Sequence, residues 1–220
     1  MSVLLPSGDR VSNPTTLPSG RLLVHVPVVH SAADLGSLAH GARERLARAI
    51  GKDAADRRIA AVHAWWRELG ERIDALTLDW KKTRLYQDGL PVCEHEMAIV
   101  TELAHKGNPN HAILLALVAR GATLMGTEDA ALIVAEYRRF QKLVQAEKAG
   151  TKDAPELRAE GEQLLRARDA FIAARVDATL RPGESGVLFL GAAHRVAALL
   201  ADKMVVQLLD HHPPSGPVRG

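Results

Sequence analysis

The chain of 220 residues contains one cysteine, few aromatic residues and almost no excess of charge of either sign. Because Cys93 stands alone, an intramolecular disulfide and any zinc site built from paired cysteines are excluded, and a reducing compartment is favoured. The 28 basic and 26 acidic residues leave a net charge of +2. So small an excess does not provide the positive surface that nucleic acids or anionic membranes bind, and we expect neither as a partner.

Long hydrophobic runs are also missing. No segment reaches the roughly 18 consecutive apolar residues that predict a transmembrane helix. The short apolar run near the N-terminus has no basic stretch before it and is interrupted by Pro6, so it lacks the pattern of a secretory leader. We therefore expect a soluble, cytoplasmic protein. An apolar fraction of 47% is typical of a globular chain, which at this length needs no structural metal to hold its core.

Three common functional motifs are absent as well. The sequence has no G-x-G-x-x-G after its first strand-like run and no G-x-x-x-x-G-K-[ST], so it lacks the fingerprints of dinucleotide and P-loop nucleotide binding. It also has no G-x-S-x-G, the elbow that carries the nucleophile in many serine hydrolases. Any chemistry must therefore come from other residues.

The sequence divides into three regions. Residues 1–20 are rich in proline, serine and glycine and are expected to form an N-terminal arm. Residues 21–210 are expected to form a single α/β domain, and residues 211–220, which begin with His211 and His212, a solvated, flexible tail. Neither repeats nor low-complexity tracts interrupt the middle region.

Strand-like apolar runs alternate with helical patterns along that domain. The strands are expected at residues 21–30, 83–86, 122–125, 186–191 and 204–208. Helices are expected at residues 35–50, 55–76, 129–148, 155–180 and 192–200, with two more between the second and third strands. Helical crossovers join neighbouring parallel strands, so this order predicts a three-layer α/β sandwich with a mainly parallel sheet and long helices on both faces.

Four strands of this sheet are followed by imidazoles or carboxylates. His30 ends the first strand, Asp88 follows the second, Glu128 follows the third and His194 follows the fourth. The carboxyl ends of parallel strands lie at one edge, where ligands bind in open α/β sheets, so we expect these side chains to converge. Two histidines with two carboxylates suit Mn²⁺, Fe²⁺, Co²⁺ or Zn²⁺, and they equally suit acid and base catalysis without a metal.

Each residue alone has a simpler structural explanation. Asp88 resembles a turn former, Asp129 an acid at a helix N-terminus, and His194 a structural histidine. Taken together, four strand ends with this chemistry favour a functional site. Arg168 and Asp169 lie in the middle of a helical pattern, where pairing on the surface is the default explanation and contact of Arg168 with substrate the alternative.

Several further polar residues lie near the second strand. We interpret Cys93 as a buried thiol, because no histidine is evident as its partner, although a nucleophile at that place is the alternative. Four others are expected to be surface or core residues rather than ligands: His95, His105, Asn110 and His111.

The segment GVLFLGAAHRVAALL, which ends the fourth strand with His194, resembles the second G-x-x-H motif of the TraB/Tiki superfamily. That superfamily includes erythromycin-esterase-like and ChaN-like haem-binding proteins. The preceding RARDAFIAARVDATL is similar to the superfamily's arginine-containing helix, and the order of elements matches over most of residues 21–208. Two departures stand out: Pro27-Val28-Val29-His30 lacks the glycine of the first G-x-x-H, and Asp88 stands where relatives have glutamate. The resemblance implies the location of a site, since members are metal-dependent proteases, esterases or haem binders.

We therefore predict a hydrolase-like enzyme, metal-dependent, that cleaves an ester or amide bond in a small-molecule or peptide substrate. His30, His194, Asp88 and Glu128 would hold the divalent metal or supply acid and base. A non-catalytic protein that binds haem or a small molecule through the same histidines is the alternative, and a structural or regulatory relic of the fold is a third. The sequence leaves homo-oligomerisation open.

Overall fold

A five-stranded parallel sheet forms the centre of the protein. The computed structural model describes residues 20–28, 39–150, 155–209 and 211. The strands are β1 (Leu22–Val28), β2 (Thr83–Gln87), β3 (Thr123–Met125), β4 (Ser185–Gly191) and β5 (Val205–Leu208). Their order in the sheet is β3-β2-β4-β1-β5, and every neighbouring pair is parallel. The predicted α/β class and parallel sheet are confirmed.

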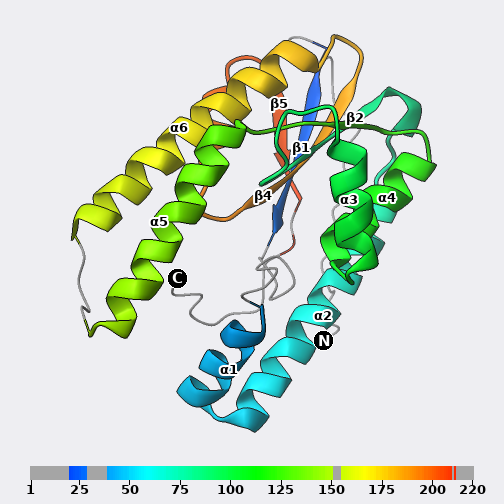
Figure 1. Cartoon of the computed structure of the whole chain (residues 1–220). Coiled ribbons are helices and arrows are strands. Elements are labelled where there is room, and N and C mark those ends of the chain that lie inside the picture. The colour runs from blue at the N-terminus through cyan, green and yellow to red at the C-terminus, as the bar shows by residue number, and fades with distance from the viewer. Residues whose placement is uncertain (1–19, 29–38, 151–154, 210, 212–220) are drawn as a thin grey trace, which may run out of the picture.

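Helices cover both faces of the sheet (Figure 1). They are α1 (Ala39–Ile50), α2 (Lys52–Asp74), α3 (Glu96–His105), α4 (Pro109–Ala119), α5 (Ala130–Lys148), α6 (Pro155–Thr179) and α7 (Val196–Leu200), with a 3₁₀ turn at Trp80–Lys82. Helices α2, α3 and α4 lie on one side, and α5 and α6 on the other. The arrangement has the three layers that the sequence predicts.

Strand β4 is buried on both faces because it separates two hydrophobic cores. Val187 and Phe189 pack into the core formed with α2, α3 and α4. Leu188 and Leu190 point the other way, into the core formed with α6 and α7. A strand with apolar residues at successive positions can satisfy both layers, which explains why GVLFLG forms the central strand between β1 and β2.

The ends of α4 and α7 follow from local sequence. Asn108 caps α4 by accepting hydrogen bonds from Asn110 N (3.0 Å) and His111 N (3.3 Å), and Pro109 is the first residue of the helix. Helix α7 begins at Val196, four residues later than expected. The reason is a turn at Gly191–His194, closed by a 3.1 Å hydrogen bond from His194 N to Gly191 O, that precedes the helix.

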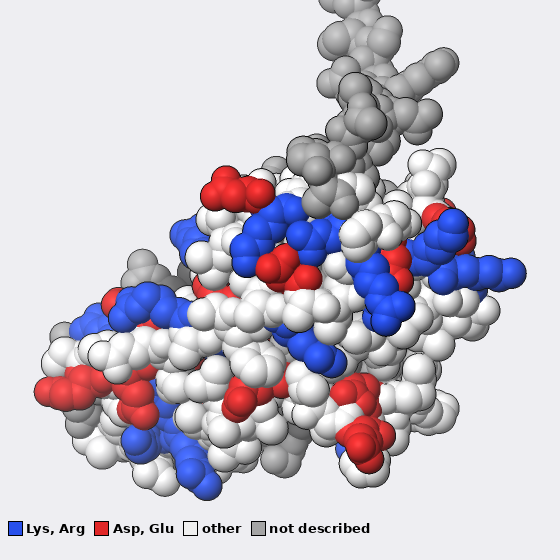
Figure 2. All heavy atoms as spheres, turned by 90° about the horizontal axis from the view of Figure 1, so that it is seen from above, with Lys and Arg blue, Asp and Glu red and all other residues white. Residues whose placement is uncertain are grey.

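The carboxyl ends of the strands face one end of the molecule. On that side the paired helices α5 and α6, and the pair α1 and α2, extend past the end of β1 (Figure 1). Viewed from above Figure 1, the basic and acidic side chains are interspersed (Figure 2), as expected from the small net charge. Within the described ranges no helix has both the length and the hydropathy to cross a lipid bilayer.

The C-terminal region differs from the expectation at one described residue. His211, predicted to lie in a solvated tail, is buried: its ring stacks on Trp65 with centroids 5.1 Å apart, and Nε2 donates to the Trp65 carbonyl oxygen at 3.1 Å. Stacking on an indole gives the imidazole an apolar surface, and the carbonyl satisfies its N–H. His212 and the expected N-terminal arm, apart from Gly20, lie outside the described residues.

Two glycines provide a test of this packing. A Cβ at Gly126 would lie 2.6 Å from Val92 Cα and 2.8 Å from the Pro91 carbonyl oxygen, whereas a Cβ at Gly70 in α2 would meet nothing closer than 3.9 Å. We expect Gly126→Ala to destabilise the protein by about 1–3 kcal/mol, and Gly70→Ala to stabilise it by up to about 1 kcal/mol. Thermal unfolding measures both changes. An unchanged melting temperature for Gly126→Ala would contradict the close approach.

Candidate functional site

Asp88 joins the ends of two strands to helix α6. Its backbone N–H donates to the Phe189 carbonyl oxygen at 2.9 Å, which continues the pairing of β2 with β4. Its carboxylate accepts from Gly191 N through Oδ2 at 3.0 Å and from Arg168 Nη2 through Oδ1 at 2.8 Å. The carboxylate therefore binds groups on α6 and β4, which the interpretation of Asp88 as a simple turn former does not account for.

Glu128, after β3, is fully buried and binds the same guanidinium. Arg168 Nε donates to Oε2 at 2.6 Å, and Arg168 Nη2 donates to Oε1 at 2.8 Å. Gly89 N donates to Oε1 at 2.6 Å, and the positive φ of 74° at Gly89 allows the turn that follows Asp88. The carboxylates of Asp88 and Glu128 thus lie on either side of one arginine.

Arg168 is the cation of this cluster. Burial tends to lower the pKa of its guanidinium, but the hydrogen bond to Glu128 and the charges of Glu128 and Asp88 outweigh that effect and raise the pKa. Its side chain keeps 14% of its surface exposed. Nε and Nη2 are taken by carboxylates, whereas Nη1 makes no hydrogen bond with any described residue. Arg168 therefore keeps N–H donors for a ligand oxygen.

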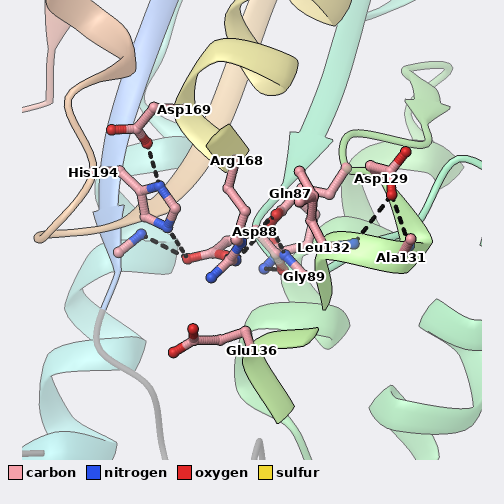
Figure 3. Close-up of polar contacts among 12 residues, drawn as sticks. Gln87, Asp88, Gly89, Asp129, Ala131, Leu132, Glu136, Arg168, Asp169 and His194 are labelled. Atoms are coloured by element: carbon pink, nitrogen blue, oxygen red, sulfur yellow. Dashed lines mark hydrogen bonds and ion pairs between the residues drawn. The ribbon is translucent and has the colours of Figure 1, made fainter. Parts of the chain in front are cut away.

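Asp169, the next residue on α6, holds the imidazole of His194 (Figure 3). Asp169 Oδ1 lies 2.5 Å from His194 Nδ1, and Oδ2 accepts from Arg195 N at 2.9 Å. Both side chains are buried, at 5% and 8% exposure. An ionised carboxylate only accepts hydrogen bonds, so Nδ1 carries the proton of this contact. When the ring is neutral, Nε2 is therefore its bare nitrogen. Nε2 lies 3.6 Å from Asp88 Oδ2.

Three of the four predicted residues thus come together: Asp88, Glu128 and His194. His30 lies outside the described residues. Asp129 is the helix-terminal acid that the simpler interpretation predicts, since its Oδ1 accepts from Ala131 N at 2.7 Å and Leu132 N at 3.1 Å. The same figure shows it turned away from His194 (Figure 3).

Two residues of the cluster were expected on the surface. Arg168 and Asp169 point inward, whereas Arg166 on the same helix is exposed and lies 3.8 Å from Glu162. The sequence does carry a signal for Asp169. It lies on the buried stripe of α6, at helical spacing from the apolar residues Ile172, Ala173 and Val176. A carboxylate on the apolar face of a helix needs a buried partner.

His25, on β1, is a neighbour of this cluster that no motif in the sequence indicates. It pairs with Leu188 across the sheet and lies on the same face as Leu23, toward α6 and α7. Its Nε2 is buried and has no hydrogen-bond partner among the described residues. Burial lowers the pKa of His25, and the positive charge that His194 carries when it is protonated lowers the pKa of His25 further.

The remaining candidates from the sequence do not join the site. Cys93 is half-exposed, and its backbone N–H donates to Glu96 Oε1 at 2.8 Å. His95 precedes α3 and His105 lies at its exposed end. Asn110 and His111 are buried at the start of α4, on the opposite face of the sheet from His194.

The donor set does not fit a divalent metal. Each oxygen of Asp88 and Glu128 already accepts an N–H, and the Arg168 charge between the carboxylates would repel a cation. His194 Nδ1 is bound to Asp169, so Nε2 is the ring nitrogen left for ligation. No group of three or more ligating side chains suited to a metal occurs in the part of the chain that the structure describes.

Comparisons with protein-family models, with curated proteins and with solved structures find no match to this chain. The resemblance of the G-x-x-H segment to the TraB/Tiki superfamily therefore stays a prediction. The site must be interpreted from its own geometry.

The occupied carboxylates give a prediction about metals. If a metal site were present, a metal concentration of about 100 times Kd would add about 2.7 kcal/mol to the free energy of unfolding. That increase corresponds to roughly 5–10 °C in melting temperature. We expect that addition of Mn²⁺, Co²⁺ or Zn²⁺, and treatment with a chelator, leave the melting temperature within error. Elemental analysis that finds one metal per chain, together with a chelator-sensitive melting temperature, would contradict this.

The buried imidazole of His25 makes stability depend on pH. Its pKa is lower in the folded protein than the ordinary value of about 6.5, so the unfolded chain binds more protons below that pH. The contribution of neutral His25 is thus present above about pH 6.5 and is lost as pH falls. We expect His25→Leu to gain stability relative to the wild type as pH is lowered, whereas His105→Leu, at an exposed histidine, does not. Thermal unfolding curves measured over a pH series give both differences; parallel curves for His25→Leu and the wild type would refute this.

Proposed function

We propose that this protein is a hydrolase in which His194 Nε2 is the general base for attack of water on an ester or amide carbonyl. The observation that carries the proposal is the buried hydrogen bond of 2.5 Å between Asp169 Oδ1 and His194 Nδ1. It fixes the ring, selects the tautomer with a bare Nε2 and stabilises the imidazolium that forms when Nε2 takes a proton.

The spacing between His194 and Asp88 supports the position of the water. Nε2 and Asp88 Oδ2 are 3.6 Å apart, which is too long for a hydrogen bond and suits two groups that contact one water molecule. His194 Nε2 would take the proton of one O–H group of that water, and Asp88 Oδ2 would accept a hydrogen bond from the other O–H group. Asp88 is itself held by Arg168 and Gly191 N, so it orients the water without moving.

Arg168 supports the other half of the reaction. Nucleophilic attack converts the carbonyl oxygen to an oxyanion, which needs hydrogen-bond donors already in position. Nη1 of Arg168, which has no hydrogen-bond partner among the described residues, would supply them, and the raised pKa of the guanidinium keeps Arg168 charged. The acyl C–O or C–N bond then breaks, and the proton on Nε2 passes to the leaving oxygen or nitrogen, which returns His194 to its neutral form.

The cost of the cluster also supports a functional role. Asp88, Glu128, Asp169 and His194 are all at most 8% exposed, so their charged and polar groups have lost their water. Apolar residues of similar volume commonly stabilise a fold as well as a buried ionic cluster does. A cluster of this kind at the carboxyl edge is where a ligand site of an open α/β sheet is expected.

The test is hydrolysis of p-nitrophenyl acetate and of a matched amide by wild type and variants. His194→Ala should lower kcat by about 10²–10⁴-fold in protein that still folds, although loss of the imidazole from the buried Asp169 carboxylate lowers the melting temperature. Asp169→Asn should lower it by at least about tenfold, because the amide can donate to Nδ1 and favour the wrong tautomer. His105→Ala, at an exposed histidine, should leave kcat unchanged. Equal activity in folded wild type and His194→Ala protein would refute His194 as the base.

A further inference from the structure

A chain of side-chain amides runs from Asp88 to the opposite face of the sheet. Gln87 Nε2 donates to the Asp88 carbonyl oxygen at 3.0 Å, and Asn110 Nδ2 donates to Gln87 Oε1 at 2.8 Å. Both side chains are buried, at 3% and 4% exposure. Because a carbonyl only accepts, Asp88 fixes the direction of the whole chain. Asn110 Oδ1 is therefore its terminal acceptor, and this atom has no hydrogen-bond partner among the described residues.

A buried donor in the same layer also lacks a partner. Trp66 on α2 is 3% exposed and belongs to the hydrophobic core between the sheet and α2, α3 and α4. Its Nε1–H makes no hydrogen bond within the part of the chain that the structure describes. An indole nitrogen donates and never accepts, so Trp66 and Asn110 have complementary needs.

Two contacts set the alignment of α2 with α4. At their C-terminal ends, Arg120 Nη1 lies 2.8 Å from Asp74 Oδ1. Closer to the starts of the two helices, a Cβ added at Gly70 would lie 3.9 Å from Ile113 Cδ1, so these two residues are within contact distance. The helices therefore run side by side in the same direction. A residue on α4 has a number 43 (Ile113 and Gly70) to 46 (Arg120 and Asp74) higher than its neighbour on α2.

The next turn of each helix toward its start brings Trp66 and Asn110 to the same level. Trp66 precedes Gly70 by one turn, and Asn110 precedes Ile113 by about one turn. Both side chains are buried between their helix and the sheet. Trp66 Nε1 and Asn110 Oδ1 do not form a direct hydrogen bond, because each of them has no partner among the described residues.

We propose that Trp66 Nε1 and Asn110 Oδ1 form a binding site for one buried hydroxyl group, either a water molecule or the hydroxyl of a small alcohol. A hydroxyl can accept from the indole N–H and donate to the amide oxygen at once. An ion is unsuited, because one group only donates, the other only accepts, and neither carries charge. The bound hydroxyl joins α2, through Asn110 and Gln87, to the backbone of Asp88. Polar sites with two or more partners are where proteins hold buried water.

The test uses the indole N–H signal of Trp66 in the full-length protein and requires no turnover, so it is independent of the catalytic proposal. The signal is assigned by its absence in Trp66→Phe, and cross-relaxation from the water resonance is recorded as both NOE and ROE. A long-lived bound water gives peaks of opposite sign in the two experiments, whereas proton exchange gives the same sign. The Trp65 and Trp80 indoles serve as references in the same spectrum. Asn110→Leu should abolish the peak, and Ile113→Val, one turn along α4, should retain it.

A second arm identifies the source of the hydroxyl. If water gives no dipolar peak, titration with methanol should shift the Trp66 indole signal saturably, and should not do so in Asn110→Leu. Either a dipolar water peak or a saturable methanol shift supports the site. Absence of both, or an exchange peak showing that the Trp66 N–H is open to bulk water, overturns it.

Discussion

One guanidinium ties together the elements that meet at the carboxyl edge of the sheet. Arg168 on α6 binds the carboxylates that follow β2 and β3, and Asp88 passes the connection to β4 through Gly191 N. Removal of one partner from such a buried pair costs about 3–5 kcal/mol, because it leaves an uncompensated charge. The relative positions of three strand ends and α6 therefore depend on this single side chain.

The same arrangement places His194. Asp169 follows Arg168 directly on α6, so the helix that binds Asp88 and Glu128 also presents the carboxylate that holds the imidazole. His194 lies in the turn after β4, the strand between β1 and β2. Two carboxylates bind Arg168 and a third, that of Asp169, binds His194, so a positive charge that forms on His194 during a reaction would be compensated by Asp169 and Asp88. Structure and proposed chemistry thus depend on the same contacts.

Much of the fold could be predicted from local patterns. The β-branched and apolar runs locate the strands, helical spacing locates the long helices, and the alternation of the two gives the parallel sheet. The carboxyl ends of parallel strands lie at one edge of the sheet, so residues that directly follow the strands can be predicted to lie together. Asp88, Glu128 and His194 were predicted in this way. What each carboxylate binds could not be predicted, because Arg168 lies 80 residues from Asp88 in sequence and 40 from Glu128. Surface pairing was the default interpretation of Arg168 and Asp169, and only the helical spacing of Asp169 from Ile172 and Val176 indicated a buried position.

The central claim is that His194 Nε2 is the bare nitrogen of the ring, and the side-chain ¹⁵N spectrum of the protein tests it most directly. Long-range ¹H–¹⁵N correlations distinguish the two neutral tautomers of a histidine. The His194 signals are assigned by their absence in His194→Ala. The hydrogen bond to Asp169 predicts that the neutral ring carries its proton on Nδ1, and that Asp169→Asn shifts the population toward Nε2–H. A wild-type spectrum with the proton on Nε2 would contradict the account, because that nitrogen could not then accept a proton from water.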